Sequence, residues 1–113
     1  MGKRRIVLYG NSVIIGAFDC SLRQSSRYEV LSLPPSQEDD LAALAPDVVL
    51  FDLEASRPEA AFGMLERHPG LMLIGVGPDI NLVKIWSGRQ LRELSTSDLL
   101  QVIDAELERS PRL

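Results

Sequence analysis

Short apolar runs alternate with amphipathic segments along this chain. The runs at residues 4–10, 28–33, 47–53 and 71–77 have the length and apolar content of β-strands, and the segments between them carry apolar residues at helical spacing. Strands that alternate with helices are typical of βαβ units around a parallel sheet. The run at 47–53 is almost unbroken up to Asp52, which predicts a central strand covered on both faces.

The segment at 12–24 predicts the first helix. Gly10-Asn11 turns the chain out of the first strand, and the Asn11 side chain is suited to an N-cap. In this register the helix carries one broad apolar stripe, formed by Val13, Ala17 and Cys20 or Ser21 together with Ile14 and Phe18. We expect the stripe to pack on the sheet.

Three further helices are indicated by residue pairs with the spacing of a capping box, in which side chains satisfy the free backbone groups of the first turn. The pairs are Ser36 with Asp39, Ser56 with Glu59, and Ser95 with Asp98. The helices that they predict lie within 34–45, from near 58 to the Arg-His-Pro-Gly segment at 67–70, and over 95–108. We expect the last helix to pack on the core through Leu99, Val102, Ile103 and Leu107.

The connection after the fourth strand departs from the βαβ pattern. Only residues 78–81 separate the run at 71–77 from the next strand-like run at 82–88. A parallel return needs a crossover of about a dozen residues or more, so we expect the fifth strand to run antiparallel to the fourth. Residues 87–89 can then turn the chain again, into a short strand at 90–94.

These elements predict a three-layer α/β/α sandwich with a flavodoxin-like sheet. The expected spatial strand order is 2-1-3-4-5, with the last strand antiparallel and a hairpin in place of the fourth crossover helix. The chain has 113 residues, of which 45% are hydrophobic and 25% charged. That size and composition predict a single domain over residues 1–113.

Charge and cysteine content exclude several classes of partner and site. The net charge of −4 argues against a nucleic-acid partner, and we interpret the basic run Lys3–Arg5 as a solvated lead-in to the first strand. Cys20 is the only cysteine, which excludes a disulfide within this chain and a multi-cysteine metal site; we interpret it as a small apolar residue of the first helix. No apolar run approaches the about 20 residues that span a bilayer. We therefore expect no membrane partner and a cytoplasmic location.

Polar residues collect where the parallel strands of the predicted sheet end, which is the edge at which open α/β sheets bind ligands. Asp52 ends the third strand. The candidate pocket around it consists of Gly10, Asn11, Ser12, Glu54 and Gly77. The stretch from Gly10 to Gly16 matches neither glycine-rich nucleotide-binding motif, so no nucleotide is implied.

The order of elements and the residues Pro-Asp-Val-Val-Leu-Phe-Asp-Leu resemble the receiver domains of bacterial response regulators. The resemblance extends from about Arg5 to Leu94 and, in general layout, to the final helix. It implies that Asp52 matches the aspartate that accepts a phosphoryl group in that family. The chain departs from the family at the other site positions: Gly10 and Asn11 replace the acidic pair after the first strand, Val76 or Gly77 replaces the hydroxyl residue, and Lys84 lies inside the hairpin.

These departures indicate that phosphoryl chemistry is lost. A transferring phosphoryl group needs a metal to neutralise its charge, and magnesium prefers carboxylates and water, so Asp52 beside the neutral Asn11 is a poor magnesium site. We therefore expect no metal, no cofactor and no enzymatic activity, and we expect Asp52 to cap the loop after its strand. The function predicted is that of a degenerate receiver-like domain that binds another protein or its own copy in bacterial signalling.

Two alternatives remain open. Asp52 could accept a phosphoryl group in an unconventional way. Ser12 could be the nucleophile of a small hydrolase, because the segment at 9–16 is similar to the Gly-Asp-Ser-Leu block of a lipase and esterase family, although His68 is the only histidine that could serve as its base.

The predicted hairpin offers a surface for the binding function. Its apolar residues Ile85, Trp86, Leu91 and Leu94 would lie near a sheet edge, and open edges and tryptophan-centred patches are common sites of pairing. The alternative is that Trp86 only covers the end of the core.

Overall fold

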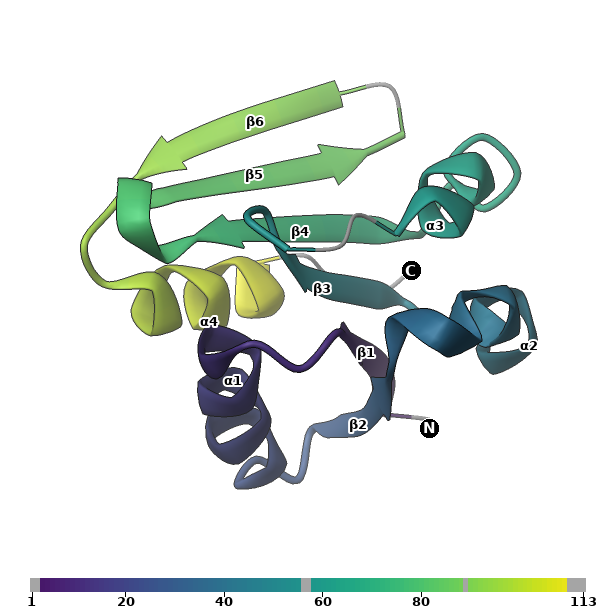
Figure 1. Cartoon of the computed structure of the whole chain (residues 1–113), viewed down its shortest axis with the longest axis horizontal. Helices are drawn as coiled ribbons and strands as arrows, with labels where there is room; N and C mark the ends of the chain where they lie inside the picture. The colour runs from purple at the N-terminus through teal and green to yellow at the C-terminus, as the bar shows by residue number, and fades with distance from the viewer. Residues whose placement is uncertain (1–2, 56–57, 89, 110–113) are drawn as a thin grey trace.

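A mixed sheet of six strands forms the centre of the computed structural model, which describes residues 3–55, 58–88 and 90–109 (Figure 1). The strands are β1 (Arg4–Tyr9), β2 (Tyr28–Leu33), β3 (Val48–Asp52), β4 (Met72–Gly77), β5 (Leu82–Ser87) and β6 (Gln90–Ser95). They lie in the order β2-β1-β3-β4-β5-β6. The pairs β1–β2, β1–β3 and β3–β4 are parallel, and the pairs β4–β5 and β5–β6 are antiparallel.

This topology confirms the predicted strand order and the antiparallel fifth strand. The four residues between β4 and β5 form the short 3-10 helix η2 (Pro78–Ile80) and the left-handed Asn81, which leaves no room for a crossover helix. The turn after Ser87 leads into β6, which extends the sheet by one more strand. We call β5 and β6 together the hairpin.

The sheet divides the core in two, and four α-helices among the described residues cover its faces. The helices are α1 (Val13–Arg23), α2 (Leu41–Leu44), α3 (Glu59–Met64) and α4 (Leu99–Arg109), and the 3-10 helix η1 (Pro35–Asp40) precedes α2. Side chains of α1 and α4 pack in one apolar cluster with one face of the sheet, and those of α2 and α3 pack in another cluster with the opposite face. Among the described helices, none has both the length and the apolar content needed to cross a bilayer.

The first helix begins at Val13, one residue later than predicted. Ser12, and not Asn11, is the N-cap, and its Oγ accepts a hydrogen bond from the Ile15 N–H at 3.4 Å. The face that meets the sheet carries Ile15, Phe18 and Leu22, whereas Val13 is 93% exposed. The prediction for the stripe was therefore wrong at Val13 and Cys20, which is exposed as well. Successive residues of a helix are about 100° apart, so Val13 and the buried Ile15 are about 200° apart and lie on nearly opposite faces.

The other predicted caps also differ. η1 follows Pro34 and has no side-chain cap, so the Ser36–Asp39 box does not form. Asp98 caps α4 through its Oδ1, which accepts from the Gln101 N–H at 3.1 Å, so the predicted cap at Ser95 was wrong. α3 ends at Met64, before the predicted end at 67–70, and its proposed cap Ser56 lies outside the described residues.

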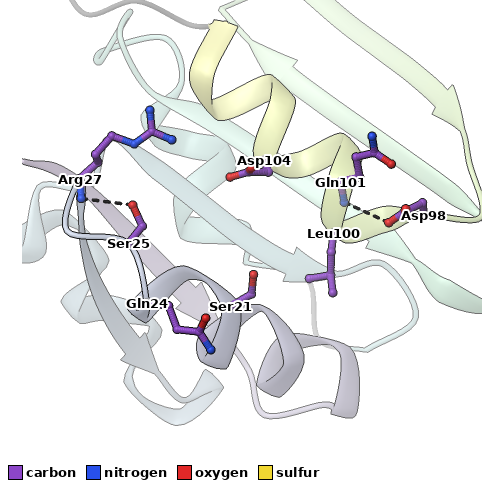
Figure 2. Close-up of a pocket in the computed structure, with 8 residues that line it drawn as sticks. All are labelled: Ser21, Gln24, Ser25, Arg27, Asp98, Leu100, Gln101 and Asp104. Carbon is purple, nitrogen blue, oxygen red and sulfur yellow. Dashed lines mark hydrogen bonds between the residues drawn. The ribbon is translucent and has the colours of Figure 1, made fainter.

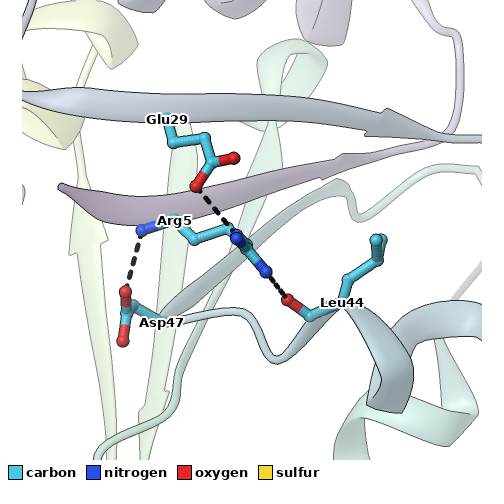
Figure 3. Close-up of polar contacts among 4 residues, drawn as sticks. All are labelled: Arg5, Glu29, Leu44 and Asp47. Carbon is cyan, nitrogen blue, oxygen red and sulfur yellow. Dashed lines mark hydrogen bonds and ion pairs between the residues drawn. The ribbon is translucent and has the colours of Figure 1, made fainter. Parts of the chain in front are cut away.

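The basic residues at the start of β1 tie together the edge of the sheet opposite Asp52 (Figure 3). The Arg5 N–H donates to Asp47 Oδ2 at 2.8 Å, and the guanidinium contacts Glu29 at 3.0 Å and the Leu44 carbonyl. Arg4 donates to the Leu107 carbonyl at 2.7 Å. The run Lys3–Arg5 was predicted to be a solvated lead-in, and this was wrong for Arg4 and Arg5, which connect β1 to β2, α2 and α4.

Candidate functional site

Asp52 ends β3 at the edge where β1, β3 and β4 have their carboxyl ends. Its side chain is only 8% exposed. A small hollow of about 70 Å³ lies beside it, lined by Asp52 with Tyr9, Gly10, Asn11, Ser12, Pro35 and Ala55. The structure thus brings together Asp52 and the three predicted pocket residues that follow β1.

The Asp52 carboxylate holds the turn that follows its strand. Its Oδ1 accepts a hydrogen bond from the Glu54 N–H at 2.8 Å, and its backbone carbonyl accepts from the Ala55 N–H at 3.2 Å. A side-chain oxygen that binds a backbone N–H two residues on is the geometry by which aspartate closes tight turns. This is the loop-capping role expected from the sequence.

The two remaining pocket residues lie elsewhere. Glu54 is exposed, and its Oε2 accepts from the Asp79 N–H at 3.2 Å. That hydrogen bond lowers the pKa of Glu54, but partial desolvation and the carboxylates of Asp79 and Asp52 outweigh it, so the pKa lies above its usual value. Gly77 is packed under Ile80, where an added Cβ would lie 2.9 Å from the isoleucine side chain. Its assignment to the pocket was wrong because the alternation of β4 directs position 77 to the sheet face that carries α2 and α3.

The groups that would hold and sense a phosphoryl group are not assembled around Asp52. Within residues 3–55, 58–88 and 90–109, no cluster of three or more histidine, cysteine or acidic residues could hold a metal ion. Lys84 is paired in register with Gly75, and Gly75 with Phe51, so Lys84 lies on the sheet face opposite to the Asp52 side chain. Its ammonium group contacts Glu93 at 3.4 Å.

Ser12 and His68 lie at opposite edges of the sheet. Ser12 follows the carboxyl end of β1, whereas His68 precedes the amino end of β4. A six-residue strand is roughly 20 Å long at about 3.3 Å per residue, so His68 is too distant to deprotonate Ser12. The Ser12 hydroxyl acts as the helix cap, and His68, the base that the serine-hydrolase alternative would use, lies out of its reach.

A hydrogen-bonded link that no sequence motif predicts begins at Tyr9, which lines the hollow. The Tyr9 hydroxyl donates to Glu38 Oε1 at 3.1 Å, and Glu38 Oε2 accepts from the Ala60 N–H in the first turn of α3 at 2.5 Å. Burial, and next the hydrogen bond to Glu38, raise the pKa of Tyr9 above its usual value. The link joins β1, η1 and α3 across sequence separations of 22 and 29 residues, which no local motif reveals.

A wide polar groove runs between α1 and α4, on the sheet face that these two helices cover (Figure 2). It has a volume of about 520 Å³ and is lined by Ser21, Gln24, Ser25, Arg27, Asp98, Leu100, Gln101 and Asp104. The Ser25 hydroxyl accepts from the Arg27 N–H at 3.2 Å, and Asp98 caps α4. Arg27 also pairs with Glu108 at 3.1 Å. These contacts serve turns, caps and helix docking.

The hairpin separates the four predicted interface residues. Ile85 is buried in the core cluster that α1 and α4 form, so its assignment to a surface was wrong. Leu94 is half-buried against the same cluster. Trp86 packs on the other face, stacked on Phe51 with ring centroids 5.8 Å apart, while Leu91 is 49% exposed. Strand alternation explains this result, because neighbouring residues point to opposite faces.

One face of the hairpin is partly exposed in the described part of the chain: Phe62 of α3 packs on Trp86 with ring centroids 4.8 Å apart, whereas Leu91, Glu93 and Ser95 are exposed. This face carries the register partners Leu82 and Ser95, Lys84 and Glu93, and Trp86 and Leu91, and we call these six residues the hairpin face. Beside them, Leu53 packs over Gly75, where an added Cβ would lie 2.6 Å from the leucine side chain. Ile80, from η2, is 60% exposed at the end of this face. The hairpin face is therefore a mixed surface: Leu82, Trp86 and Leu91 are apolar, and the Lys84–Glu93 ion pair crosses its middle.

The comparisons with known proteins identify no family. No protein-family model matches the chain, and no curated protein sequence is significantly similar to it. Among solved structures, the chain is similar to UDP-D-quinovosamine 4-dehydrogenase from Vibrio fischeri, with 17% sequence identity and a TM-score of 0.46 over 88% of this chain and 99% of that chain. This likeness is too weak to support an argument about activity or substrate.

Proposed function

We propose that this protein is a non-catalytic, receiver-like domain that acts by binding a protein through its hairpin, in bacterial signalling or regulation. In this proposal the sheet keeps the flavodoxin-like order of a receiver, and the hairpin replaces the helix that would follow β4. The observation that carries the proposal is the hairpin itself, which combines an exposed leucine, Leu91, beside Trp86 with an open sheet edge at β6.

The surroundings of Asp52 support the absence of phosphoryl transfer. Its carboxylate is nearly buried and already accepts the Glu54 N–H. Among the described residues, Asp52 is the only acid that lines its hollow, while Glu54 accepts a hydrogen bond from the Asp79 N–H. Phosphoryl transfer to Asp52 would need a metal ion at this edge to offset the charge.

The hairpin supports binding because its exposed apolar groups are of the kind that partners cover. Leu91 is exposed at the turn end of the hairpin face, next to the ring cluster of Trp86, Phe51 and Phe62. Contacts between proteins draw most of their energy from a few apolar and aromatic anchors that lie close together. Soluble proteins rarely leave large apolar patches open without such a use.

The test compares two charged substitutions at exposed leucines. Leu91→Glu lies on the hairpin face, and Leu100→Glu is the matched control on α4, where the leucine is 40% exposed. Wild type and both variants are immobilised and exposed to lysate of the host cell, and their masses in solution are measured by light scattering. We expect a bound protein, or a dimer, that persists with Leu100→Glu and is lost with Leu91→Glu. Equal behaviour of all three proteins would show that the hairpin is not the binding surface.

A further inference from the structure

We infer that β6 binds an extended strand of a different protein, added antiparallel to its open edge, and that its charge order excludes a second copy of this chain as the occupant. The strand that fits is apolar, with a basic residue opposite Glu93 and an acidic residue opposite Arg92. This inference rests on the proposed function and specifies the kind of partner.

The open edge of β6 presents a defined set of backbone groups. The Thr96 N–H donates to the Asn81 carbonyl at 2.7 Å, in the same register as the β5–β6 pair. The even-numbered residues of β6 are therefore the ones that form hydrogen bonds with β5. Hydrogen-bonded positions alternate along an antiparallel pair. The N–H and C=O groups of Leu91, Glu93 and Ser95 therefore point away from β5, and Figure 1 shows no element beyond β6.

Two copies of the chain can join these edges in few ways. An antiparallel pair about a two-fold axis keeps each face of the sheet on the same side, so residues that oppose each other must both be even-numbered or both be odd-numbered. Within β6, the two longest overlaps of this kind cover five residues, Gln90–Leu94 and Leu91–Ser95. The first places Arg92 opposite its own copy, and the second places Glu93 opposite its own copy. Like charges directly opposite each other destabilise a strand pair.

Other antiparallel overlaps about a two-fold axis pair at most three residues of β6, and the remaining arrangements of two copies fail on geometry. If the two β6 strands ran parallel about a two-fold axis, each residue would lie beside the same residue of the other copy, with the two side chains on opposite faces of the sheet. Neighbouring strands in a pleated sheet have their side chains on the same face at each level, so this arrangement does not form. The register that pairs Arg92 with Glu93 of the other copy would be favourable in charge. It requires the second copy to be turned over, so that its opposite sheet face lies on the same side. The β6 strand of that copy would then present the edge that is already paired with its own β5.

A strand from another protein is free of these constraints, because either of its edges can face β6. Its preferred sequence follows from β6: apolar residues opposite Leu94 and Leu91, and a basic and an acidic residue between them. Arg92 contacts Glu106, and Glu93 contacts Lys84, yet the side chains of Arg92 and Glu93 remain 45% and 51% exposed. Both charges therefore remain available to a strand laid along the edge.

The experiment uses two capped peptides of equal composition as probes, Thr-Leu-Lys-Glu-Leu-Thr and Thr-Leu-Glu-Lys-Leu-Thr. The first matches β6 in an antiparallel arrangement, and the second places like charges opposite Arg92 and Glu93. Backbone amide spectra of the full chain are recorded during titration with each peptide. Because each cross-strand charge pair contributes about 0.2–1 kcal/mol, we expect the first peptide to bind at least about threefold more tightly. The amides of Leu91, Glu93 and Ser95 should become protected from hydrogen exchange with solvent when the peptide binds. The amides of Arg92 and Leu94 are already protected, because they bind β5.

The outcomes separate this inference from the proposed function. A dimer in solution that Leu91→Glu dissolves would overturn the inference and leave the proposed function standing. Equal binding of the two peptides, tighter binding of the second, or binding of neither would overturn the inference too. Loss of a captured protein in the Leu91→Glu comparison bears on the proposed function alone. Glu93→Gln, a mild change at an exposed position, should reduce the preference between the peptides without changing the fold.

Discussion

Replacing Asp52 tests whether its carboxylate closes a turn or serves chemistry. In the structure its Oδ1 accepts the Glu54 N–H at 2.8 Å, and an asparagine Oδ1 in the same place can accept the same bond. Asp52→Asn should therefore change the free energy of unfolding by less than about 0.5 kcal/mol, a typical range for substitutions that disturb no special feature. Asp52→Ala removes the acceptor at a nearly buried position, and hydrogen bonds of this kind contribute about 1–2 kcal/mol.

The measurement is urea unfolding of wild type and the two variants, followed by circular dichroism. With a slope of about 1–1.5 kcal/mol per M for a domain of this size, Asp52→Ala should lower the midpoint by roughly 1 M, while Asp52→Asn should stay close to wild type. Equal losses in both variants would show that the negative charge, and not the hydrogen bond, is what the site needs. In the same samples, acetyl phosphate and magnesium should leave the mass of wild type unchanged; an added phosphoryl group that Asp52→Asn abolishes would restore the phosphoacceptor alternative.

Three further predictions concern other parts of the molecule. Gly75→Ala should destabilise the fold by about 1–2 kcal/mol because its Cβ would overlap the Leu53 side chain, and Leu53→Ala in the same chain should recover part of that loss in a double-mutant cycle of urea unfolding; simple additivity would contradict the packing. The raised pKa of Glu54 means that its charged form opposes folding at neutral pH and that this effect disappears as pH falls through the folded and then the unfolded pKa. Glu54→Gln should therefore be more stable relative to wild type at pH 7 than at pH 3.5, and a constant difference between the two pH values would refute this. Cys20 is exposed, so a maleimide should label the native protein as completely as the urea-unfolded one, and slow native labelling would contradict its placement.

Part of the sheet topology was open to prediction because it depends on features that act over short stretches. The unbroken apolar run that ends at Asp52 predicted a central strand, and β3 is buried at all its positions. The four-residue connection after β4 permits only an antiparallel return, whatever the rest of the chain does. Chain reach therefore gives the antiparallel return of β5, whereas the order β2-β1-β3-β4 was predicted from the flavodoxin-like fold that the βαβ pattern favours.

The caps and faces were harder to predict because adjacent residues compete for the same role. Asn11 and Ser12 are both good N-caps, so the sequence does not decide between them. Val13 and Ile15 are both apolar, and only the packing of α1 on the sheet decides that Ile15 is buried and Val13 exposed. In the hairpin, Ile85 and Trp86 were predicted to share one surface, although neighbouring strand residues face opposite ways, and the sequence does not show which of them faces α4. That depends on where α4 returns over the sheet, a contact formed between residues far apart in the chain.

The candidate site was only partly predictable for the same reason. Asp52 and the residues after β1 meet because parallel strands end at one edge. The Tyr9–Glu38–Ala60 link was missed because it joins three elements that meet only in the folded chain. Gly77 was misplaced because the sequence does not show that Ile80 folds back over it.

The turn that Asp52 closes also connects the sheet edge to the hairpin. Leu53 lies between Asp52 and Glu54 in that turn, and its N–H donates to the Val76 carbonyl at 2.8 Å. This position places the Leu53 side chain over Gly75, beside the hairpin face, where a crossover helix after β4 would otherwise supply the cover. An aspartate that holds Leu53 there stabilises the floor of the binding surface that we propose. Loss of the Asp52 acceptor should thus loosen the hairpin face, even though Asp52 lies on the other side of the sheet.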